Sequence, residues 1–283
     1  MKMIDLQKLC TFLVSMNSQS EKHIGYCGVS KSEIFHALTE DFSDLPLKEL
    51  FYIHSNQGHI IGAFGFDVDM ENRSAEVWGP FTKDNEIASV IWSEAFPEMK
   101  KYVDTFSFFV NLENINAIDF MDKIGAKKQG GHITYIVSRH QEKLESIDSS
   151  FQEYTPIYME SFIQLHEKTF PNSYYNGEQI IRQLNIHKRL FLWIKDHKVI
   201  SYVYMEADPL HHEGSIEFVS VCPTYRARGI GKKITTFAIN QLFSDDRIHT
   251  ITICVGDRNK NAIGLYQSLG FKVKHQLIHY TLR

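Results

Sequence analysis

The stretch SVCPTYRARGIGKKI, residues 220–234, decides the fold because it joins two differently patterned apolar runs through a pair of glycines. The residues before it, SIEFVSV, alternate with the period of two that is typical of a half-buried strand. Pro223 cannot donate to a ladder and helps to end the strand there. Beyond the glycines, apolar residues recur at helical spacing, at Ile230, Ile234, Phe237, Ala238 and Leu242. The stretch therefore predicts a strand, a loop and a helix.

The two glycines, Gly229 and Gly231, fall in the first turn of the predicted helix. Backbone N–H groups in a first turn lack intrahelical partners and carry partial positive charge, so they favour an anion such as phosphate. Glycines let a diphosphate approach the backbone closely, and basic side chains supply countercharge. These are Arg226, Arg228, Lys232 and Lys233. The alternative interpretation is an ordinary surface turn, in which glycine and charge are common.

Composition limits the classes of partner. The chain has 283 residues, 43% of them hydrophobic, and a formal net charge of -4, so any anion site must be local. We expect no nucleic-acid partner and no membrane partner. Asp5 and Lys8 interrupt the first apolar run, which predicts neither a signal peptide nor a span and favours a cytoplasmic protein. The cysteines and histidines lack metal-ligand spacing, so we expect no metal.

An internal repeat divides the chain into two halves. Residues 110–127, VNLENINAIDFMDKIGAK, align without a gap with residues 255–272, VGDRNKNAIGLYQSLGFK, at seven identities in eighteen positions. Strands alternate with helices in the second half, which favours an α/β layered domain with a mixed sheet. The polar segment 138–154 separates the halves. We predict domains at 1–145 and 146–283.

Two motifs resemble those of the GNAT superfamily of N-acetyltransferases. The pattern R-x-x-G-x-G, at Arg226, Gly229 and Gly231, is similar to the acetyl-coenzyme A loop of that family. NKNAIGLYQSLGF, residues 259–271, resembles its N-x-x-A-x-x-L-Y-x-x-x-G-F motif. The resemblance covers roughly residues 150–283 and, more faintly, the first half. It implies two GNAT-like mixed-sheet domains and acetyl-CoA as the co-substrate.

The resemblance also implies where the coenzyme lies. The strand before the loop would splay from its neighbour and hold the pantetheine arm through its backbone at Val219 and Val221. Backbone N–H groups of the loop would hold the diphosphate, with Lys232 near the phosphates. The loop residues are Arg226, Ala227, Arg228, Gly229, Ile230 and Gly231. Asn259 would bond the coenzyme arm, cap a helix, or do both.

Two residues are candidates for proton transfer. Tyr266 is placed by the resemblance to protonate the leaving sulfur, because a phenol with an ordinary pKa of about 10 is protonated at neutral pH. The alternative role for Tyr266 is core packing on its helical face. Glu217 is the candidate general base, since strand alternation places it on one face with Ser215, Val219 and Val221. The alternative for Glu217 is a structural ion pair with a lysine.

Few features of the sequence indicate the identity of the acceptor. In FPNSYYNGEQI, residues 170–180, Tyr174 and Tyr175 occupy a region that flanks the acceptor in the resembled family. Ordinary loop anchoring by both tyrosines stays open. The resemblance implies that the acceptor is a small molecule or peptide with a primary amine, and a net-acidic protein is compatible with such a cationic substrate.

The first half resembles a degenerate copy. Glu86 stands opposite Gly229, beside Asp84, and would repel a diphosphate, while Met121 stands opposite Tyr266. We expect this half to bind no coenzyme and to shape or cover the acceptor pocket. The predicted activity is acetyl transfer to an amine by direct attack. The competing hypothesis is a non-catalytic coenzyme A sensor or scaffold; a structural protein would leave both motif matches unexplained.

Overall fold

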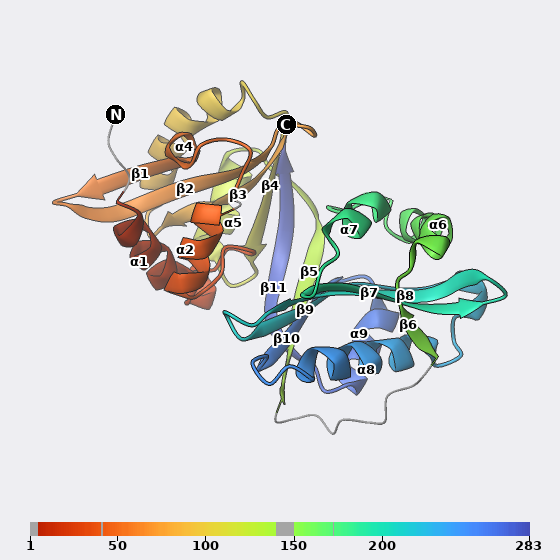
Figure 1. The fold of residues 1–283 in the computed structure, drawn as a ribbon. Coiled ribbons are helices and arrows are strands. Elements are labelled where there is room, and N and C mark those ends of the chain that lie inside the picture. The colour runs from red at the N-terminus through yellow and green to blue at the C-terminus, as the bar shows by residue number, and fades with distance from the viewer. Residues whose placement is uncertain (1–4, 41, 140–149, 172) are drawn as a thin grey trace. The chain divides into compact units, whose positions relative to one another are not determined.

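The computed structural model describes residues 5–40, 42–139, 150–171 and 173–283. It divides into two compact units (Figure 1). Unit 1 contains residues 1–133, 256–258 and 275–283, and unit 2 contains residues 134–255 and 259–274. The domain boundary expected near residue 145 lies outside the described residues.

Unit 1 is an α/β structure built from a mixed sheet and helices. Its strand order is β1-β2-β3-β4, followed by the end of β11. Among these strands, β3 and β4 pair in parallel, whereas the β1–β2, β2–β3 and β4–β11 pairs are antiparallel. The elements are α1 (Leu6–Asn17), η1 (Ser20–Lys22), α2 (Lys31–Glu40), α3 (Leu47–Leu50), β1 (Phe51–Asn56), β2 (His59–Asp69), β3 (Ser74–Thr82), α4 (Asn85–Met99), β4 (Thr105–Asn111), α5 (Ile115–Lys123) and the start of β5 (Lys127–Ser138).

Unit 2 repeats this plan. Its strand order is β5-β10-β9-β8-β7-β6, with β9 and β10 parallel. The elements are β6 (Phe151–Glu153), η3 (Pro156–Tyr158), α6 (Met159–Thr169), α7 (Gly177–Gln183), β7 (Lys188–Lys195), β8 (Lys198–Asp208), β9 (Glu213–Val221), η4 (Pro223–Tyr225), α8 (Ile230–Phe243), β10 (Thr250–Gly256), α9 (Lys260–Ser268) and β11 (Lys272–Leu282). The predicted strand, loop and helix around residues 220–234 are confirmed.

The two units exchange the ends of two strands. β5 starts in unit 1, but its residues from Thr134 belong to unit 2, whereas β11 ends in unit 1 from His275 onward. There β11 pairs antiparallel with β4, from Leu277↔Asn111 to Leu282↔Phe106. A cut near residue 140 would therefore remove a strand segment from unit 2. For this reason, deletion of the first half is not a test of what that half does for activity.

Helices cover both faces of the sheet in unit 2. Figure 1 shows α6 and α7 on one side of β7 to β9, and α8 and α9 on the other. On the α6 side, Phe162 and Tyr202 pack edge to face, with ring centroids 4.9 Å apart. On the α8 side, Phe237 packs against Phe191 at 4.9 Å. These two layers hold β9 and its loop in place, which positions the candidate site.

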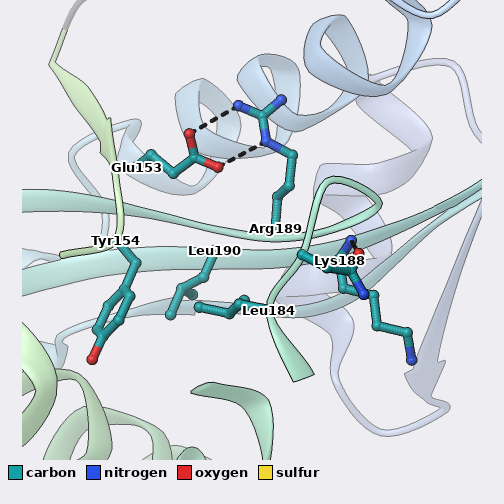
Figure 2. Close-up of a pocket in the computed structure, with 7 residues that line it drawn as sticks. Glu153, Tyr154, Leu184, Lys188, Arg189 and Leu190 are labelled. Atoms are coloured by element: carbon teal, nitrogen blue, oxygen red, sulfur yellow. Dashed lines mark hydrogen bonds and ion pairs between the residues drawn. The ribbon is translucent and has the colours of Figure 1, made fainter. Parts of the chain in front are cut away.

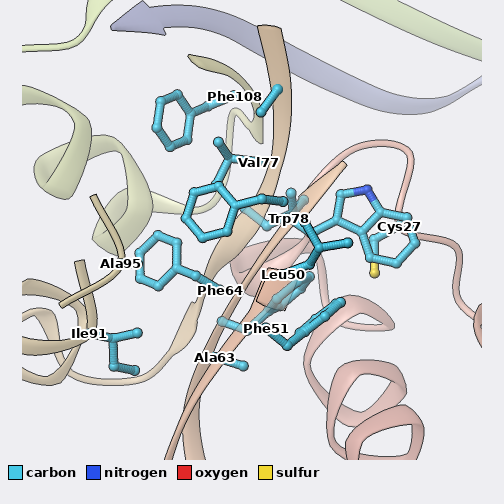
Figure 3. Packing of buried hydrophobic residues seen from close by; sticks show 14 of the residues in the cluster. Cys27, Leu50, Phe51, Ala63, Phe64, Val77, Trp78, Ile91, Ala95 and Phe108 are labelled. Carbon is cyan, nitrogen blue, oxygen red and sulfur yellow. The ribbon is translucent and has the colours of Figure 1, made fainter. Parts of the chain in front are cut away.

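Unit 1 is packed with aromatic side chains. The β3–β4 ladder holds three pairs, Ser74↔Thr105 to Glu76↔Ser107, although both strands continue. The next residue on each strand, Val77 or Phe108, is fully buried. Figure 3 shows both residues in a cluster with Phe64. The place where these strands diverge is therefore filled by the protein's own side chains.

Candidate active site

Strands β9 and β10 diverge at the centre of unit 2. Their parallel ladder holds four pairs, Thr250↔Glu213 to Ile253↔Ile216, although β9 continues to Val221 and β10 to Gly256. The next residues are Glu217, which is half-buried, and Cys254, which is exposed. The divergence that the resemblance implied is confirmed. At the β3–β4 divergence in unit 1 the next residues are fully buried, whereas at the β9–β10 divergence they are not.

The turn at the start of α8 has the backbone that an anion site needs. Gly229 is the N-cap residue, with φ 77° and ψ -2°, and Ala227 also has a positive φ of 58°. Gly229 has no side chain to cap the helix, so the first-turn N–H groups are left to other partners. A Cβ built on Gly229 meets nothing within 4 Å. The turn therefore presents polar backbone to open space.

Contacts within the loop tie it to the end of β9. Arg226 donates from Nε to the carbonyl oxygen of Val221 at 3.0 Å. A Cβ on Gly231 would lie 3.4 Å from Leu265 and 4.0 Å from Val221, so this glycine packs between the strand end and α9. The side chains of Arg228 and Lys232 are exposed. The loop thus combines a fixed backbone with cationic side chains that remain accessible.

The helix-capping role of Asn259 is observed. Its Oδ1 accepts from the N–H of Ala262 at 3.2 Å, at the start of α9. This bond uses the carbonyl oxygen of the amide side chain and leaves its NH₂ group for another partner. Asn114 caps α5 of unit 1 in the same way, through the N–H of Ala117 at 3.1 Å. The cap thus belongs to the repeated architecture, and a coenzyme contact by Asn259 stays a prediction.

Tyr266 is a buried phenol on α9, only 7% exposed. Its ring lies near those of Tyr135 on β5 and Phe271, with centroids 6.3 Å and 6.0 Å away. Burial raises the pKa of Tyr266 to about 12, with a further contribution from the charge of Cys254. The phenol is therefore protonated throughout the physiological pH range, as a proton donor must be. These ring contacts also show that Tyr266 contributes to the core.

Glu217 lies in a β-bulge, and the face predicted for it is wrong in part. In the β8–β9 ladder Tyr204 pairs with Phe218 and Met205 with Ile216, so Glu217 is an extra residue without a cross-strand partner. The bulge shifts the alternation along β9. Glu217 therefore faces the α6 side, as its bond from Tyr174 shows, whereas Val221 faces α8 near Gly231. Strict alternation had placed Glu217 and Val221 on one face.

The environment of Glu217 shifts its acidity in two directions. Burial raises the pKa of this carboxyl, while hydrogen bonds from Ser215 and Tyr174 partly lower it. The negative charge of Glu206 raises the pKa and Lys188 lowers it. The net shift is upward. Such a carboxylate is a stronger base than an exposed glutamate, which suits proton removal from an amine.

Tyr174 covers Glu217. The Tyr174 hydroxyl donates to Glu217 Oε2, and its ring stacks on Phe218 with centroids 5.0 Å apart. The pKa of Tyr174 is raised by desolvation of its hydroxyl and by the charge of Glu217, so the phenol is the proton donor in this bond. The side chain is still 61% exposed. An accessible phenol on the candidate base fits the acceptor side of a site.

A buried histidine that the sequence did not single out anchors the loop carrying Tyr174. His166 on α6 is fully buried, and burial lowers its pKa. Its Nε2 lies 2.9 Å from the carbonyl oxygen of Tyr175, and its Nδ1 lies 2.6 Å from the Tyr202 hydroxyl. A carbonyl only accepts, so Nε2 donates and the neutral ring accepts from Tyr202. The backbone of Tyr175 is thus anchored to α6, and the roles of the Tyr174 and Tyr175 rings stay predictions.

A second carboxylate lies near the first. Glu206 on β8 pairs across the strands with Ser215, accepts from the Tyr204 hydroxyl at 2.5 Å, and forms an ion pair with Lys188 at 3.2 Å. No local sequence pattern marks this group, because the cross-strand register decides its position. Lys188 thus pairs with Glu206 and acts on Glu217 through its charge.

An open pocket lies elsewhere in unit 2. Its lining residues are Glu153, Tyr154, Leu184, Asn185, Lys188, Arg189 and Leu190. Figure 2 shows Glu153 and Arg189 joined by two contacts there, at 2.9 Å and 3.2 Å. No residue predicted for the site lines this pocket. Because its arginine is already paired, it offers an anion little charge.

The predicted residues form two groups in unit 2. The loop group joins Val221, Arg226 and Gly231, and the acceptor group joins Glu217 and Tyr174. In the described part of the chain, neither a hydrogen bond nor a ring contact links Tyr266 to the acceptor group. Within the same ranges, no cluster of three or more histidine, cysteine or acidic side chains could hold a metal ion. None of the described helices has the length and apolar composition to cross a bilayer.

Unit 1 lacks the features of the loop group. At the start of α4 the Asp84 carboxylate accepts from the N–H of Glu86 at 2.7 Å, which satisfies a backbone group that a phosphate would need. Met121, opposite Tyr266 in the repeat, is fully buried and has no acidic proton. These observations support the expectation that unit 1 does not bind the coenzyme.

Comparisons with known proteins agree with this geometry. The model of the acetyltransferase (GNAT) family matches residues 152–271. A GCN5-related N-acetyltransferase from Sphaerobacter thermophilus superimposes with a TM-score of 0.78 at 12% identity, over 98% of this chain and 92% of that one. A tandem GNAT protein from the clavulanic acid biosynthesis pathway gives 0.66 at 11%, over 98% and 95%.

A third solved structure, a putative acetyltransferase from Pyrococcus horikoshii, gives a TM-score of 0.61 at 11% identity, over 98% of this chain and 85% of that one. No curated protein sequence gives a significant match. At these identities the structures show a shared fold, and the family model carries the assignment of activity class. Residues 152–271 match the GNAT acetyltransferase family model, which indicates an acyltransferase domain there, and a fold shared with GNAT proteins extends over nearly the whole chain.

Proposed function

We propose that unit 2 transfers an acetyl group from acetyl-CoA to a primary amine by direct attack. The turn at Gly229 carries this proposal, because its uncapped helix start faces open space at the end of a diverging strand pair. The exposed side chains of Arg226, Arg228 and Lys232 match the charge of a diphosphate. Loop amides, including those of Ile230 and Gly231, would hold that group.

The protein's part in the reaction is to move two protons. The bound coenzyme supplies a thioester carbonyl carbon and leaves as a thiol. Glu217 takes a proton from the ammonium form of the acceptor, so that the amine nitrogen can form the new C–N bond. As the C–S bond breaks, Tyr266 donates its phenolic proton to the sulfur. The second proton that the nitrogen loses as the amide forms returns through solvent to the Tyr266 phenolate, which restores the acid. Val219 and Val221 would align the coenzyme arm through backbone groups.

The acceptor enters on the side of Tyr174 in this proposal. Its amine must replace the Tyr174 hydroxyl at Glu217, since both groups are hydrogen-bond donors to the same carboxylate. Tyr174 is exposed and lies on the loop between α6 and α7, so it can turn aside without disturbing the core. Tyr175 would then border the acceptor with its ring, while its backbone stays bonded to His166.

Calorimetric titration with acetyl-CoA, followed by a thiol-release assay over a panel of small amines and peptides, tests this function. We expect saturable binding with one site per chain and release of coenzyme A with at least one class of primary amine. Binding without release from any amine class would favour the sensor or scaffold. Absence of binding would contradict the proposal altogether.

Replacing Glu217 with glutamine should remove the acidic limb of the pH profile. The carboxylate acts only when deprotonated, so wild-type kcat/KM falls as pH drops through its raised pKa. The variant should lose about 100-fold in kcat/KM at neutral pH, within the usual range for a general base. Steady-state rates from pH 5 to 9 measure both effects.

Tyr174→Phe is the matched control for Glu217. It keeps the carboxylate but removes a hydrogen bond that lowers the carboxyl pKa, so the acidic limb should move to higher pH and remain visible. A glutamine variant with the wild-type pH profile would remove Glu217 from the mechanism. An unmoved limb in Tyr174→Phe would show that the limb belongs to another group.

A further inference from the structure

Two cations share one aromatic ring beside the turn at Gly229. Tyr225 ends η4, four residues before Gly229, and is half-buried. The Nζ of Lys195, at the tip of the β7–β8 hairpin, lies 5.4 Å from the centroid of its ring. The guanidinium carbon of Arg228 also lies 5.4 Å from that centroid. A hairpin distant in sequence thus brings a charge to the phosphate turn.

Neither cation is neutralised by the protein. In the described part of the chain, no carboxylate forms an ion pair or hydrogen bond with Lys195 or Arg228, although Asp196 is the next residue in the hairpin. Like charges repel, and one aromatic ring offsets this only partly. The whole chain is acidic, with a formal net charge of -4, so the positive charge at Lys195 and Arg228 is local and does not reflect the overall composition. An anion that contacts both side chains would neutralise this local excess of charge.

We propose that Lys195 and Arg228, held against Tyr225, bind the 3′-phosphate on the ribose of the coenzyme. This inference rests on the proposed function, in which the turn at Gly229 holds the diphosphate. The coenzyme carries its 3′-phosphate apart from the diphosphate, so it needs a second anion site near the first. The loop supplies one cation of that site, and the hairpin supplies the other.

The side chains suit a phosphate dianion. A guanidinium donates two parallel hydrogen bonds to phosphate oxygens, and an ammonium adds a compact point charge. The Tyr225 ring limits the freedom of both long side chains before binding, which lowers the entropy lost when the phosphate is held. Tyr225 is therefore a positioning residue, because it acts through the two cations.

The test compares acetyl-CoA with 3′-dephospho-acetyl-CoA, which lacks only the proposed ligand group. Calorimetry should give a wild-type preference for acetyl-CoA of about tenfold or more, the effect of one strong charge-assisted contact. Lys195→Met should reduce this preference to less than about threefold and leave the affinity for the dephospho form unchanged. Lys198→Met removes the same charge from the same hairpin, away from Tyr225, and should keep the wild-type preference.

The possible outcomes separate the two proposals. If the wild-type protein binds both coenzymes equally, the 3′-phosphate assignment is wrong and the diphosphate site stands. If Lys195→Met and Lys198→Met weaken the binding of both coenzymes to the same degree, the hairpin contributes only non-specific electrostatic attraction. This result would also overturn the assignment. If the wild-type protein binds neither coenzyme, the proposed function fails and this inference fails with it.

Inorganic phosphate at millimolar concentration should displace neither coenzyme, because a lone phosphate gains nothing from the turn at Gly229. Displacement of acetyl-CoA alone would point to a free-phosphate site.

Discussion

Gly229→Glu is expected to raise the dissociation constant of acetyl-CoA about 100-fold, with a smaller effect on stability. The substitution puts a carboxylate where the diphosphate would lie. Two like charges about 5 Å apart, at an effective dielectric constant of about 20, repel by roughly 3 kcal/mol. Each 1.4 kcal/mol is a factor of ten in affinity. Titration calorimetry at fixed ionic strength measures the change.

Unit 1 shows how a carboxylate blocks such a turn. Asp84 accepts from the N–H of Glu86 at the start of α4, so the helix start is already satisfied from within the chain. A glutamate at residue 229 has the same opportunity, because its side chain lies beside the free N–H groups of α8. The expected loss therefore has two sources: repulsion of the diphosphate and occupation of the amides that would bind it.

Gly58→Glu is the matched control. Gly58 has a φ of +81° and, like Gly229, nothing within 4 Å of an added Cβ, so the backbone strain and the added charge are the same. The strain costs about 1 kcal/mol in either case. Gly229→Ala carries the strain without the charge and should weaken binding only a few-fold. If Gly229→Glu bound acetyl-CoA like the wild-type protein, the diphosphate would have to lie elsewhere.

The local elements of unit 2 could be predicted from the sequence because their signals are local. Alternation up to Val221, the proline after it and the helical spacing from Ile230 onward each depend on neighbouring residues. The same holds for Asn259, whose side chain caps the helix that begins one residue later. Backbone geometry at Gly229 followed from the residue type, since glycine readily adopts a positive φ.

The arrangement of the acceptor group could not be predicted, because register and distant contacts decide it. A bulge at Glu217 moves one side chain to the other face of the strand, and no local pattern marks it. His166 meets Tyr202 only because α6 packs on β8. The strand ends exchanged between the units are a similar case: a strand pattern shows that β11 exists but does not name β4 as its partner.

Tyr266→Phe is expected to lower kcat about 100-fold while leaving acetyl-CoA binding within about twofold of wild type. The ring is kept, so the contacts with Tyr135 and Phe271 remain, and only the hydroxyl is lost. Loss of a general acid costs 100-fold to 10,000-fold in rate. Rapid-quench measurement of a single turnover separates this chemical step from product release.

Tyr280→Phe controls for the loss of a buried hydroxyl. Tyr280 lies on β11 in unit 1 and is 4% exposed, close to the 7% of Tyr266. Its substitution should change neither kcat nor acetyl-CoA binding. If Tyr266→Phe kept full activity, the residue would be a core tyrosine and the leaving sulfur would take its proton from solvent.

The pH profile separates the two proton-transfer roles. Tyr266 must be protonated to act, and with its pKa raised to about 12 it stays protonated across any practical assay range. Tyr266→Phe should therefore lower the whole profile and leave its acidic limb in place, whereas Glu217→Gln should remove that limb. If the phenylalanine variant also lost the acidic limb, Tyr266 would be acting on the amine side of the reaction, and the division of roles between the two residues would be wrong.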